Sequence, residues 1–321
     1  SNVEYRIIQK EFPNLHSFQY SIFNIQYSVH FDLRAKCIRM VCMYILFDIG
    51  GTKMRVVSAD RKKFLAEPMV VNTPQDFNEG IETLKRIVEN LAHGEKIEAI
   101  VGGVAGPLDA EKTMLVNSPN LGGWVGHNLK KALGEAFSVP VSIENDTALV
   151  GLGEANFGAG RGKSIVVYMT ISTGVGGVRI VDGNIDENAL GFEPGHQIID
   201  PDNSLCPECD GNDLEAYVSG TAVEKRFGKK PYDIHDDAIW DELAKFLAYG
   251  LNNTIVHWSP DIIVLGGSMM KEIGIPIPAV RKHLAEILKI FPTQPQIEKA
   301  ELQDFGGLYG ALFFARTHYY Y

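Results

Sequence analysis

Two pairs of short apolar runs, rich in β-branched residues, are each joined by a segment rich in glycine and threonine. Residues 44–47 and 54–59 flank the first such segment, and residues 165–171 and 178–181 flank the second, about 120 residues later. Runs of this length and composition, bounded by glycine, indicate strands. The pattern therefore predicts two β-hairpins in distant parts of the chain.

The rest of the chain predicts helices and buried strands in a repeating order. Apolar residues at helical spacing predict a helix over residues 77–91, with Thr73 as its cap and Pro74 at its first position. Further helices are expected at 129–137, 147–156, 213–226, 237–257 and 277–290, and buried strands at 99–104, 139–143 and 261–267. Strands followed by helices, twice over, predict an α/β fold with a repeated core.

Composition excludes several classes of protein. The chain has 321 residues and a net charge of −10, which argues against broad binding to nucleic acid or to anionic membranes. No apolar stretch reaches the length of a membrane span. Four cysteines are too few for a disulfide framework in a chain of this size, so we expect a cytoplasmic protein.

Residues 1–42 differ from the rest of the chain. They are rich in aromatic residues but show neither a helical nor an alternating period, and the first predicted strand begins near Met43. We interpret residues 1–42 as an extension of unknown role that adds nothing to catalysis.

The two glycine-rich turns suggest a site for phosphate. Glycine lets the backbone reach positive φ and brings N–H groups close to an anion. A Walker loop or a dinucleotide fingerprint would be followed by a helix, whereas strands lie on both sides of these turns. Either turn alone could be an ordinary tight hairpin. Because there are two of them, and Asp48 precedes the first Gly-Gly pair, we expect a polyphosphate held from two domains.

Asp146 is the best candidate for acid–base chemistry. It follows an apolar strand and precedes a helix, the position where open α/β sheets bind ligands. A carboxylate there could accept the proton of an alcohol during phosphoryl transfer. Asp146 could also simply cap the helix, and the two roles are compatible.

Several motifs in order resemble the ROK family of sugar kinases and sugar-responsive repressors. They are residues 48–53, 144–146, 172–177, 193–196, Glu215 and 265–268, and the resemblance extends over residues 43–316. It implies the actin-like ATPase (ribonuclease H-like) fold, with two duplicated α/β domains and a cleft between them. The implied domains are residues 43–157 with 307–321, and residues 158–306. Members of the family are often dimers, so a homodimer is expected.

The same resemblance implies a role for each motif. Asp146 would be the general base that deprotonates the C6 hydroxyl of a hexose. The sugar hydroxyls would be bound by Ser118, Asn120, Asn145, Glu193, His196 and Glu215. Asp48 would orient Mg²⁺ or its waters. ATP would be held by the remaining motif residues: Gly50, Gly51, Thr52, Lys53, Thr173, Gly174, Gly176, Gly177, Gly266 and Gly267.

The resemblance leaves the sugar open. The favoured activity is ATP-dependent and glucokinase-like, and the alternative is a kinase of N-acetylmannosamine or N-acetylglucosamine. A sugar-responsive repressor is a third alternative, although residues 1–42 show no helix-turn-helix pattern.

A zinc motif of the family is only partly present in this sequence. The family often carries H-x(9–11)-C-x-C-G-x-x-G-C-x-E, whereas here the cysteines are Cys206 and Cys209, and Asp213 stands where the third should be. His196, Cys206, Cys209 and Asp213 could supply four zinc ligands. Alternatively, the site is lost and leaves two free thiols.

Overall fold

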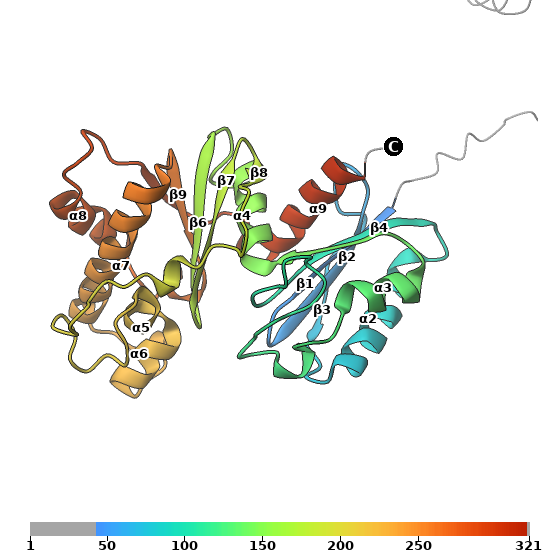
Figure 1. The fold of residues 1–321 in the computed structure, drawn as a ribbon, viewed down its shortest axis with the longest axis horizontal. Coiled ribbons are helices and arrows are strands. Elements are labelled where there is room, and N and C mark those ends of the chain that lie inside the picture. The colour runs from blue at the N-terminus through green and yellow to red at the C-terminus, as the bar shows by residue number, and fades with distance from the viewer. Residues whose placement is uncertain (1–42, 320–321) are drawn as a thin grey trace, which may run out of the picture. The chain divides into compact units, whose positions relative to one another are not determined.

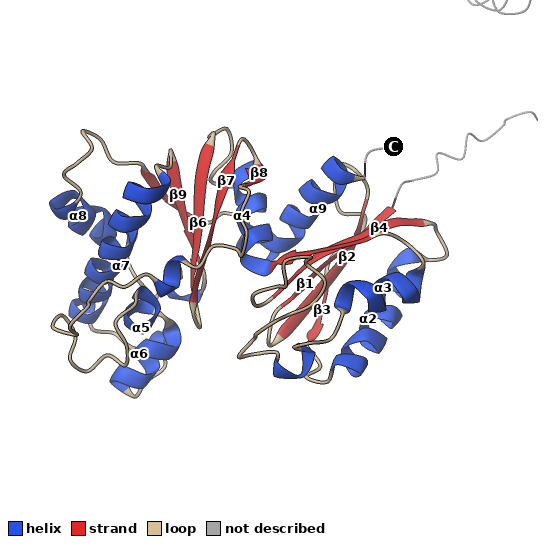
Figure 2. Ribbon diagram, viewed as in Figure 1, coloured by secondary structure: helices blue, strands red, loops and turns tan. Residues whose placement is uncertain are grey.

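The structure, a computed structural model, describes residues 43–319 and contains two five-stranded sheets (Figures 1 and 2). The proposed extension, residues 1–42, lies outside the described residues. The first sheet has the order β3-β2-β1-β4-β5 and the second has the order β10-β9-β6-β7-β8. In each sheet an antiparallel hairpin is followed by a third antiparallel strand on one side and two parallel strands on the other. The repeated α/β core predicted from the sequence is thus confirmed.

The strands of the first sheet are β1 (Met43–Ile49), β2 (Lys53–Ala59), β3 (Met69–Asn72), β4 (Ile97–Val104) and β5 (Val141–Asn145). Those of the second are β6 (Ile165–Ile171), β7 (Val175–Val181), β8 (Asn184–Ile185), β9 (Ile262–Gly266) and β10 (Gln296–Lys299). Both predicted hairpins are present, as β1–β2 and β6–β7.

Helices cover both sheets, and two of them lie between the sheets. The α-helices are α2 (Phe77–Ala92), α3 (Leu129–Phe137), α4 (Asp146–Asn156), α5 (Leu214–Val218), α6 (Gly220–Phe227), α7 (Asp237–Trp258), α8 (Ile277–Ile287) and α9 (Gly306–His318). Short 3₁₀ helices are η1 (Gly122–Trp124), η2 (Pro194–His196), η3 (Pro231–Asp233), η4 (Ser268–Met270) and η5 (Gln303–Phe305). Figure 1 shows α4 and α9 between the two sheets. None of the helices in residues 43–319 is long and apolar enough to cross a membrane.

Three apolar cores hold these layers together. The first lies between the first sheet and helices α2 and α3, and the second between the second sheet and helices α5 to α8. The third joins both sheets through α4 and α9. Leu149 on α4 and Leu308 on α9 are fully buried in this third core. The sheets are thus connected by apolar packing as well as by the chain.

Three predicted helices differ from those in the structure, and one of them is α8, which ends at Ile287 and not at residue 290. Helix α2 is capped by Asp76, whose carboxylate accepts the Glu79 N–H at 3.0 Å, so the cap predicted at Thr73 was wrong. Thr73 instead donates its hydroxyl to the Gly50 carbonyl at 2.7 Å and ties this loop to the first hairpin. The helix predicted over 213–226 is two helices, because Ser219 ends α5 and caps α6.

Candidate active site

The first hairpin turn is closed by its own backbone and braced by the segment before α2. The Gly50 N–H donates to the Lys53 carbonyl at 2.9 Å, and Gln75 donates to the Gly51 carbonyl at 2.9 Å. A Cβ on Gly51 would lie 2.4 Å from the Asn120 Cβ, so only glycine fits there. Lys53 points its ammonium to Asn72 at 2.7 Å and is exposed. Exposed Thr52 completes this turn.

The second hairpin turn is braced by the start of α6. The Ser172 N–H donates to the Gly174 carbonyl at 2.8 Å, and the Gly220 N–H donates to the Ser172 carbonyl at 2.6 Å. The Thr173 carbonyl accepts the Thr221 N–H at 3.3 Å. Because both turns are braced by other elements, their backbones are held in place without a ligand.

Four glycines bring other elements close to β7 and β9. Gly176 faces Thr147, and Gly177 faces Pro194. A Cβ on Gly266 would lie 2.4 Å from the Tyr168 hydroxyl oxygen. Gly267 has φ 93° and precedes η4, where a side chain would be strained.

Asp146 is the first residue of α4, and its neighbour caps the helix. The Asn145 side chain accepts the Ala148 N–H at 3.1 Å and donates to the Gly106 carbonyl at 3.0 Å. The Asp146 carboxylate accepts the Thr147 N–H at 2.7 Å. Burial raises the pKa of Asp146, and the bonds from Thr147 oppose this rise. The capping role considered for Asp146 therefore belongs to Asn145, while Asp146 keeps a half-buried carboxylate with a raised pKa.

Asp48 lies at the end of β1, opposite Arg55 on β2. The Arg55 guanidinium is 3.6 Å from the Asp48 carboxylate and 3.8 Å from that of Asp304, just before α9. Burial and then the charge of Asp146 raise the pKa of Asp48 to about 7, while Arg55 lowers it. A Cβ on Gly307 would lie 3.2 Å from the Asp48 Cγ. The predicted metal residue and the predicted base are thus close enough to repel each other.

The predicted sugar ligands Glu193, His196 and Glu215 interact electrostatically. Burial raises the pKa of Glu193; His196 lowers it, and Glu215 and Asp146 raise it. Among the described residues, no group donates a hydrogen bond to the Glu193 carboxylate. Glu215, on α5, accepts the Val175 N–H at 2.7 Å, and His196 contacts Asp213. The structure therefore brings these three side chains and Asp146 into one cluster.

Ser118 and Asn120 are held differently. Ser118 is buried and donates its hydroxyl to the Ala105 carbonyl at 2.8 Å. Asn120 is exposed and lies against Gly51 of the first hairpin. Of the two, Asn120 is thus the one open to solvent.

Two cavities meet at the second hairpin turn. The first, of about 570 Å³, is lined by Asn120, Thr173, Gly174, Asp213, Glu215 and their neighbours. The second, of about 610 Å³, is lined by Thr173, Thr221, Tyr232, Ser268 and Lys271 among others. Thr173 therefore stands between a cavity with sugar-ligand candidates and a cavity that follows the Gly266-Gly267 strand end.

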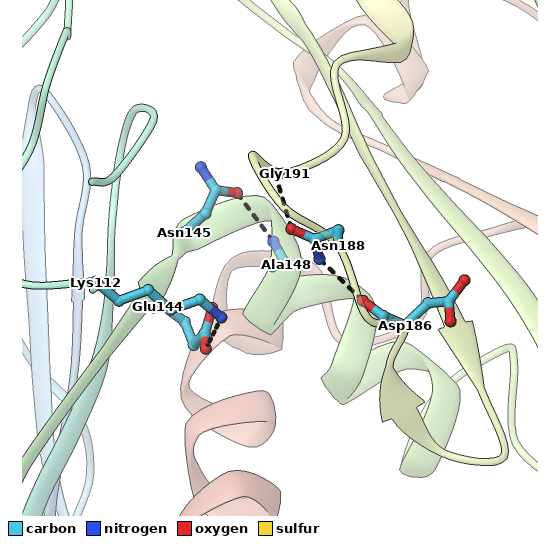
Figure 3. A network of polar contacts seen from close by, with 7 residues as sticks. All are labelled: Lys112, Glu144, Asn145, Ala148, Asp186, Asn188 and Gly191. Carbon is cyan, nitrogen blue, oxygen red and sulfur yellow. Dashed lines mark hydrogen bonds and ion pairs between the residues drawn. The ribbon is translucent and has the colours of Figure 1, made fainter. Parts of the chain in front are cut away.

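A third, smaller cavity adjoins Asn145 and Glu193. It measures about 100 Å³, and its apolar lining includes Leu108, Val178, Leu190 and Phe192. Figure 3 shows the loop that carries Leu190: the Asn188 side chain donates to the Asp186 carbonyl and accepts the Gly191 N–H. On the other side of this cavity, the Lys112 ammonium lies 2.5 Å from the Glu144 carboxylate.

The predicted zinc site requires correction. Cys206 and Cys209 form a disulfide, so neither is the thiolate that zinc requires, and neither is a free thiol. His196 and Asp213 do contact each other. However, within residues 43–319, no three His, Cys, Asp or Glu side chains gather as a metal-binding group. The residues present do not fit a structural zinc ion.

Several residues of the site are not among those predicted from the sequence. Arg55 could have been found from strand alternation, because residues directly opposite in a hairpin point to the same face, and Asp48 is its partner. Thr221, Tyr232 and Lys271 line the cavity at the second hairpin but belong to elements far apart in sequence. Only the tertiary fold brings them together.

The chain is similar in sequence and in structure to several known proteins. The chain is 27% identical over 301 residues to a glucokinase of Thermotoga maritima, covering 82% of this chain and 94% of that protein. It is 29% identical over 290 residues to a fructokinase of Zymomonas mobilis, covering 84% and 95%. The crystal structure of a ROK family glucokinase from Streptomyces griseus, in complex with glucose and AMPPNP, matches with a TM-score of 0.70 and 26% identity, covering 86% and 99%.

This structural similarity confirms the actin-like ATPase fold implied by the sequence motifs. The model of the ROK family matches residues 44–318, nearly all of the part of the chain that the structure describes. The chain therefore belongs to the ROK family.

Proposed function

We propose that this protein is an ATP-dependent sugar kinase that phosphorylates the C6 hydroxyl of a hexose, with Asp146 as the general base. The observation that carries the proposal is the position of Asp146: its charge acts on Asp48, next to the first hairpin, and on Glu193, in the polar cluster. Asp146 would thus lie between the proposed phosphate site at the first hairpin and the proposed sugar site around Glu193. Burial raises the pKa of Asp146, which makes it a stronger proton acceptor than an exposed carboxylate.

In the proposed reaction, the C6 oxygen attacks the γ-phosphorus of ATP. The new O–P bond forms as the bond to the β-phosphate oxygen breaks, ADP leaves, and the hydroxyl proton passes to the Asp146 carboxylate. The Thr147 N–H bond to Asp146 holds the carboxylate in place at the start of α4. The base is therefore oriented before substrate arrives, as positioning catalysis requires.

Sugar recognition would use Glu193, His196 and Glu215. The Glu193 carboxylate is exposed and accepts no hydrogen bond from the described residues, so both of its oxygens are free to accept sugar hydroxyls. The Asn145 amide already donates to the Gly106 carbonyl and accepts the Ala148 N–H, so its main contribution would be to hold Asp146 and the Gly106 loop.

Asp48 would hold a divalent cation or its waters, close to Asp146. Burial, and then the charge of Asp146, raise the pKa of Asp48, and a cation with its waters would offset both effects. Mg²⁺, when bound, would neutralise charge on the β- and γ-phosphates. Arg55 is placed to add a positive charge on the same side. The nucleotide would extend from the second hairpin into the cavity of about 610 Å³.

We also propose that residues 43–157 with 307–321, and residues 158–306, act as two domains that close on the sugar. Separate apolar cores on the two sheets support this division. Closure would exclude water and limit ATP hydrolysis. Small-angle scattering with and without sugar tests it, and light scattering tests the proposed homodimer.

The test of function is a coupled assay of ADP release with glucose, fructose, mannose and the two N-acetyl sugars, for the wild type and Asp146→Asn. Turnover of a hexose that is lost in the variant supports the proposal. No turnover of any sugar, together with binding to a specific DNA operator, would favour a sugar-responsive repressor instead.

A kinase of N-acetylated hexosamines is the second candidate. The observation in its favour is the cavity of about 100 Å³ beside Glu193, whose lining combines apolar residues such as Val178 and Phe192 with polar ones such as Asn188, as the methyl and amide parts of an acetamido group would require. A cavity of about 150 Å³ can hold benzene, so this one has room for about four heavy atoms, which is the size of an acetamido group. Preference for N-acetylmannosamine over mannose in the same assay would establish this alternative.

A further inference from the structure

Glu154 is a buried carboxylate that the proposed reaction does not use. It lies on α4, about two turns after Asp146. Its relative exposure is 0%, and no Lys, Arg or His of the described residues forms an ion pair with it. An unpaired buried carboxylate is strongly unfavourable unless hydrogen bonds compensate for the lost water. The groups that donate these bonds to Glu154 therefore indicate its role.

Within residues 43–319, three groups donate to Glu154, all of them backbone N–H groups from two distant segments. One carboxylate oxygen, Oε2, accepts from Ala159 at 3.0 Å and from Glu301 at 3.2 Å. The other, Oε1, accepts from Leu302 at 2.8 Å. Hydrogen bonds to a charged acceptor are about twice as strong as neutral ones. Glu154 thus ties both segments to helix α4.

These two segments are the connections between the two sheets. Residues 157–164 lead from α4 to β6, and residues 300–305 lead from β10 back to α9. The first is fitted closely to the carboxylate, since a Cβ on Gly158 would lie 2.1 Å from Glu154 Oε2. A single side chain therefore fixes both places where the chain passes from one sheet to the other.

Next to the Glu154 hydrogen bonds, helices α4 and α9 contact each other through glycine residues. Gly153 faces the Gly306 carbonyl, and Gly310 lies against the Leu149 carbonyl, so the two backbones are in direct contact there. Side chains of the third core, such as Leu152 and Leu308, pack around this contact. Small sliding of packed helices is one way in which domains move. Glu154 would then hold one end of α4 while Asp146 occupies the other.

We propose that Glu154 is a positioning residue of the kinase reaction. By fixing both connections to α4, it makes the two sheets move about one pivot and directs Asp146 toward the second hairpin when the sugar binds. This role rests on the proposed function.

The test compares Glu154→Gln with Leu152→Ala, which removes a buried side chain of the third core from the same helix. Glutamine keeps the volume of Glu154 but places an amide N–H₂ against backbone donors. We expect hydrogen exchange at Ala159, Glu301 and Leu302 to quicken together by about tenfold or more. We also expect kcat to fall roughly 10- to 100-fold while the sugar KM changes less than about threefold. Leu152→Ala should lower the thermal midpoint without either effect.

Three outcomes would overturn the proposal. The first is faster hydrogen exchange in only one of the two connections of Glu154→Gln. The second is an unchanged kcat in Glu154→Gln. The third is a Leu152→Ala variant that loses as much kcat as Glu154→Gln when the two variants have the same thermal midpoint. If Glu154→Gln does not fold, Gly158→Ala, whose Cβ would lie 2.1 Å from Glu154 Oε2 and so displace this carboxylate, should reproduce the kcat loss; wild-type kcat would refute the role. Hydrogen exchange can be measured without turnover. If the protein has no kinase activity but both connections exchange faster together in Glu154→Gln, the proposed function is contradicted, whereas the role of Glu154 in fixing both connections is not.

Discussion

The Nδ1 atom of His196 lies 3.0 Å from Oδ2 of Asp213. This contact raises the pKa of His196, chiefly through the hydrogen bond to the carboxylate. It also fixes the orientation of the imidazole ring, which leaves Nε2 for the proposed sugar. A carboxylate that orients a histidine in this way acts on substrate binding without touching the substrate.

Asp213→Asn should therefore weaken sugar binding with little effect on kcat. We expect the sugar KM to rise roughly tenfold, because an amide holds the ring less firmly than a carboxylate. The pKa of His196 should fall, so that the pH dependence of KM moves to lower pH. Asparagine still caps α5 through its side-chain oxygen, as Asp213 does for the Ala216 N–H. Asp236→Asn, at the cap of α7, is the matched control, and an equal KM change there would contradict the prediction.

Asp146→Asn should abolish most turnover but keep the fold. General-base catalysis contributes about 10²- to 10⁴-fold, so kcat should fall by a factor in this range while the sugar KM changes little. Asparagine can still accept the Thr147 N–H, so the start of α4 should remain intact. Steady-state kinetics and calorimetric titration with the sugar measure the two quantities. A kcat within about threefold of wild type would exclude Asp146 as the base.

Asp48→Asn should stabilise the protein at high pH. The folded pKa of Asp48, about 7, lies above its ordinary value of 3.8, so the folded state binds the proton more tightly than the unfolded state. The associated stability is present below pH 3.8 and is lost as pH rises to 7. A difference of about three units corresponds to about 4 kcal/mol at most. Urea unfolding at pH 5 and pH 8, without divalent cations, measures the free energy of unfolding of both proteins. The difference in favour of Asp48→Asn should be larger at pH 8, and an equal difference at both pH values would contradict this.

The fold was predictable because local signals and tertiary structure agree in most elements. Helix α3 has the predicted bounds, since its apolar positions and its cap at Asn128 coincide. The prediction failed at Thr73 and Ser219, where a side chain with capping chemistry serves a tertiary contact or divides one helix into two. Such choices depend on neighbours that are distant in sequence.

The candidate site was predictable only in its motif residues. Glu193, His196 and Glu215 were singled out, and the structure brings them together. The bond of His196 to Asp213 and the disulfide were not foreseen, because contiguous motifs do not report which side chains finally pair. Arg55 was missed because its significance depends on the strand partner, Asp48.

Reduction of the Cys206–Cys209 disulfide should destabilise the loop before α5 without releasing metal. The closed loop is short, and the chain-entropy relation gives about 2 kcal/mol for such a loop. Thermal unfolding with and without dithiothreitol should therefore show a lower midpoint in the reduced protein. The double variant Cys206→Ser, Cys209→Ser should match the reduced wild type and should not respond to the reductant. Stoichiometric zinc in elemental analysis of the purified protein would contradict the disulfide.

Gly310→Ala and Gly134→Ala should change stability in opposite directions. A Cβ on Gly310 would lie 1.8 Å from the Leu149 carbonyl oxygen, so α9 must move away from α4. Overpacking of this kind costs about 1–3 kcal/mol, and a clash with backbone should place the cost at the upper end. Gly134 lies in α3 with nothing within 4 Å of the added Cβ, so alanine should stabilise that helix by about 0.5–1 kcal/mol. Urea unfolding of both variants measures the difference, and a destabilised Gly134→Ala or a neutral Gly310→Ala would show that the α4–α9 contact is looser than the structure indicates.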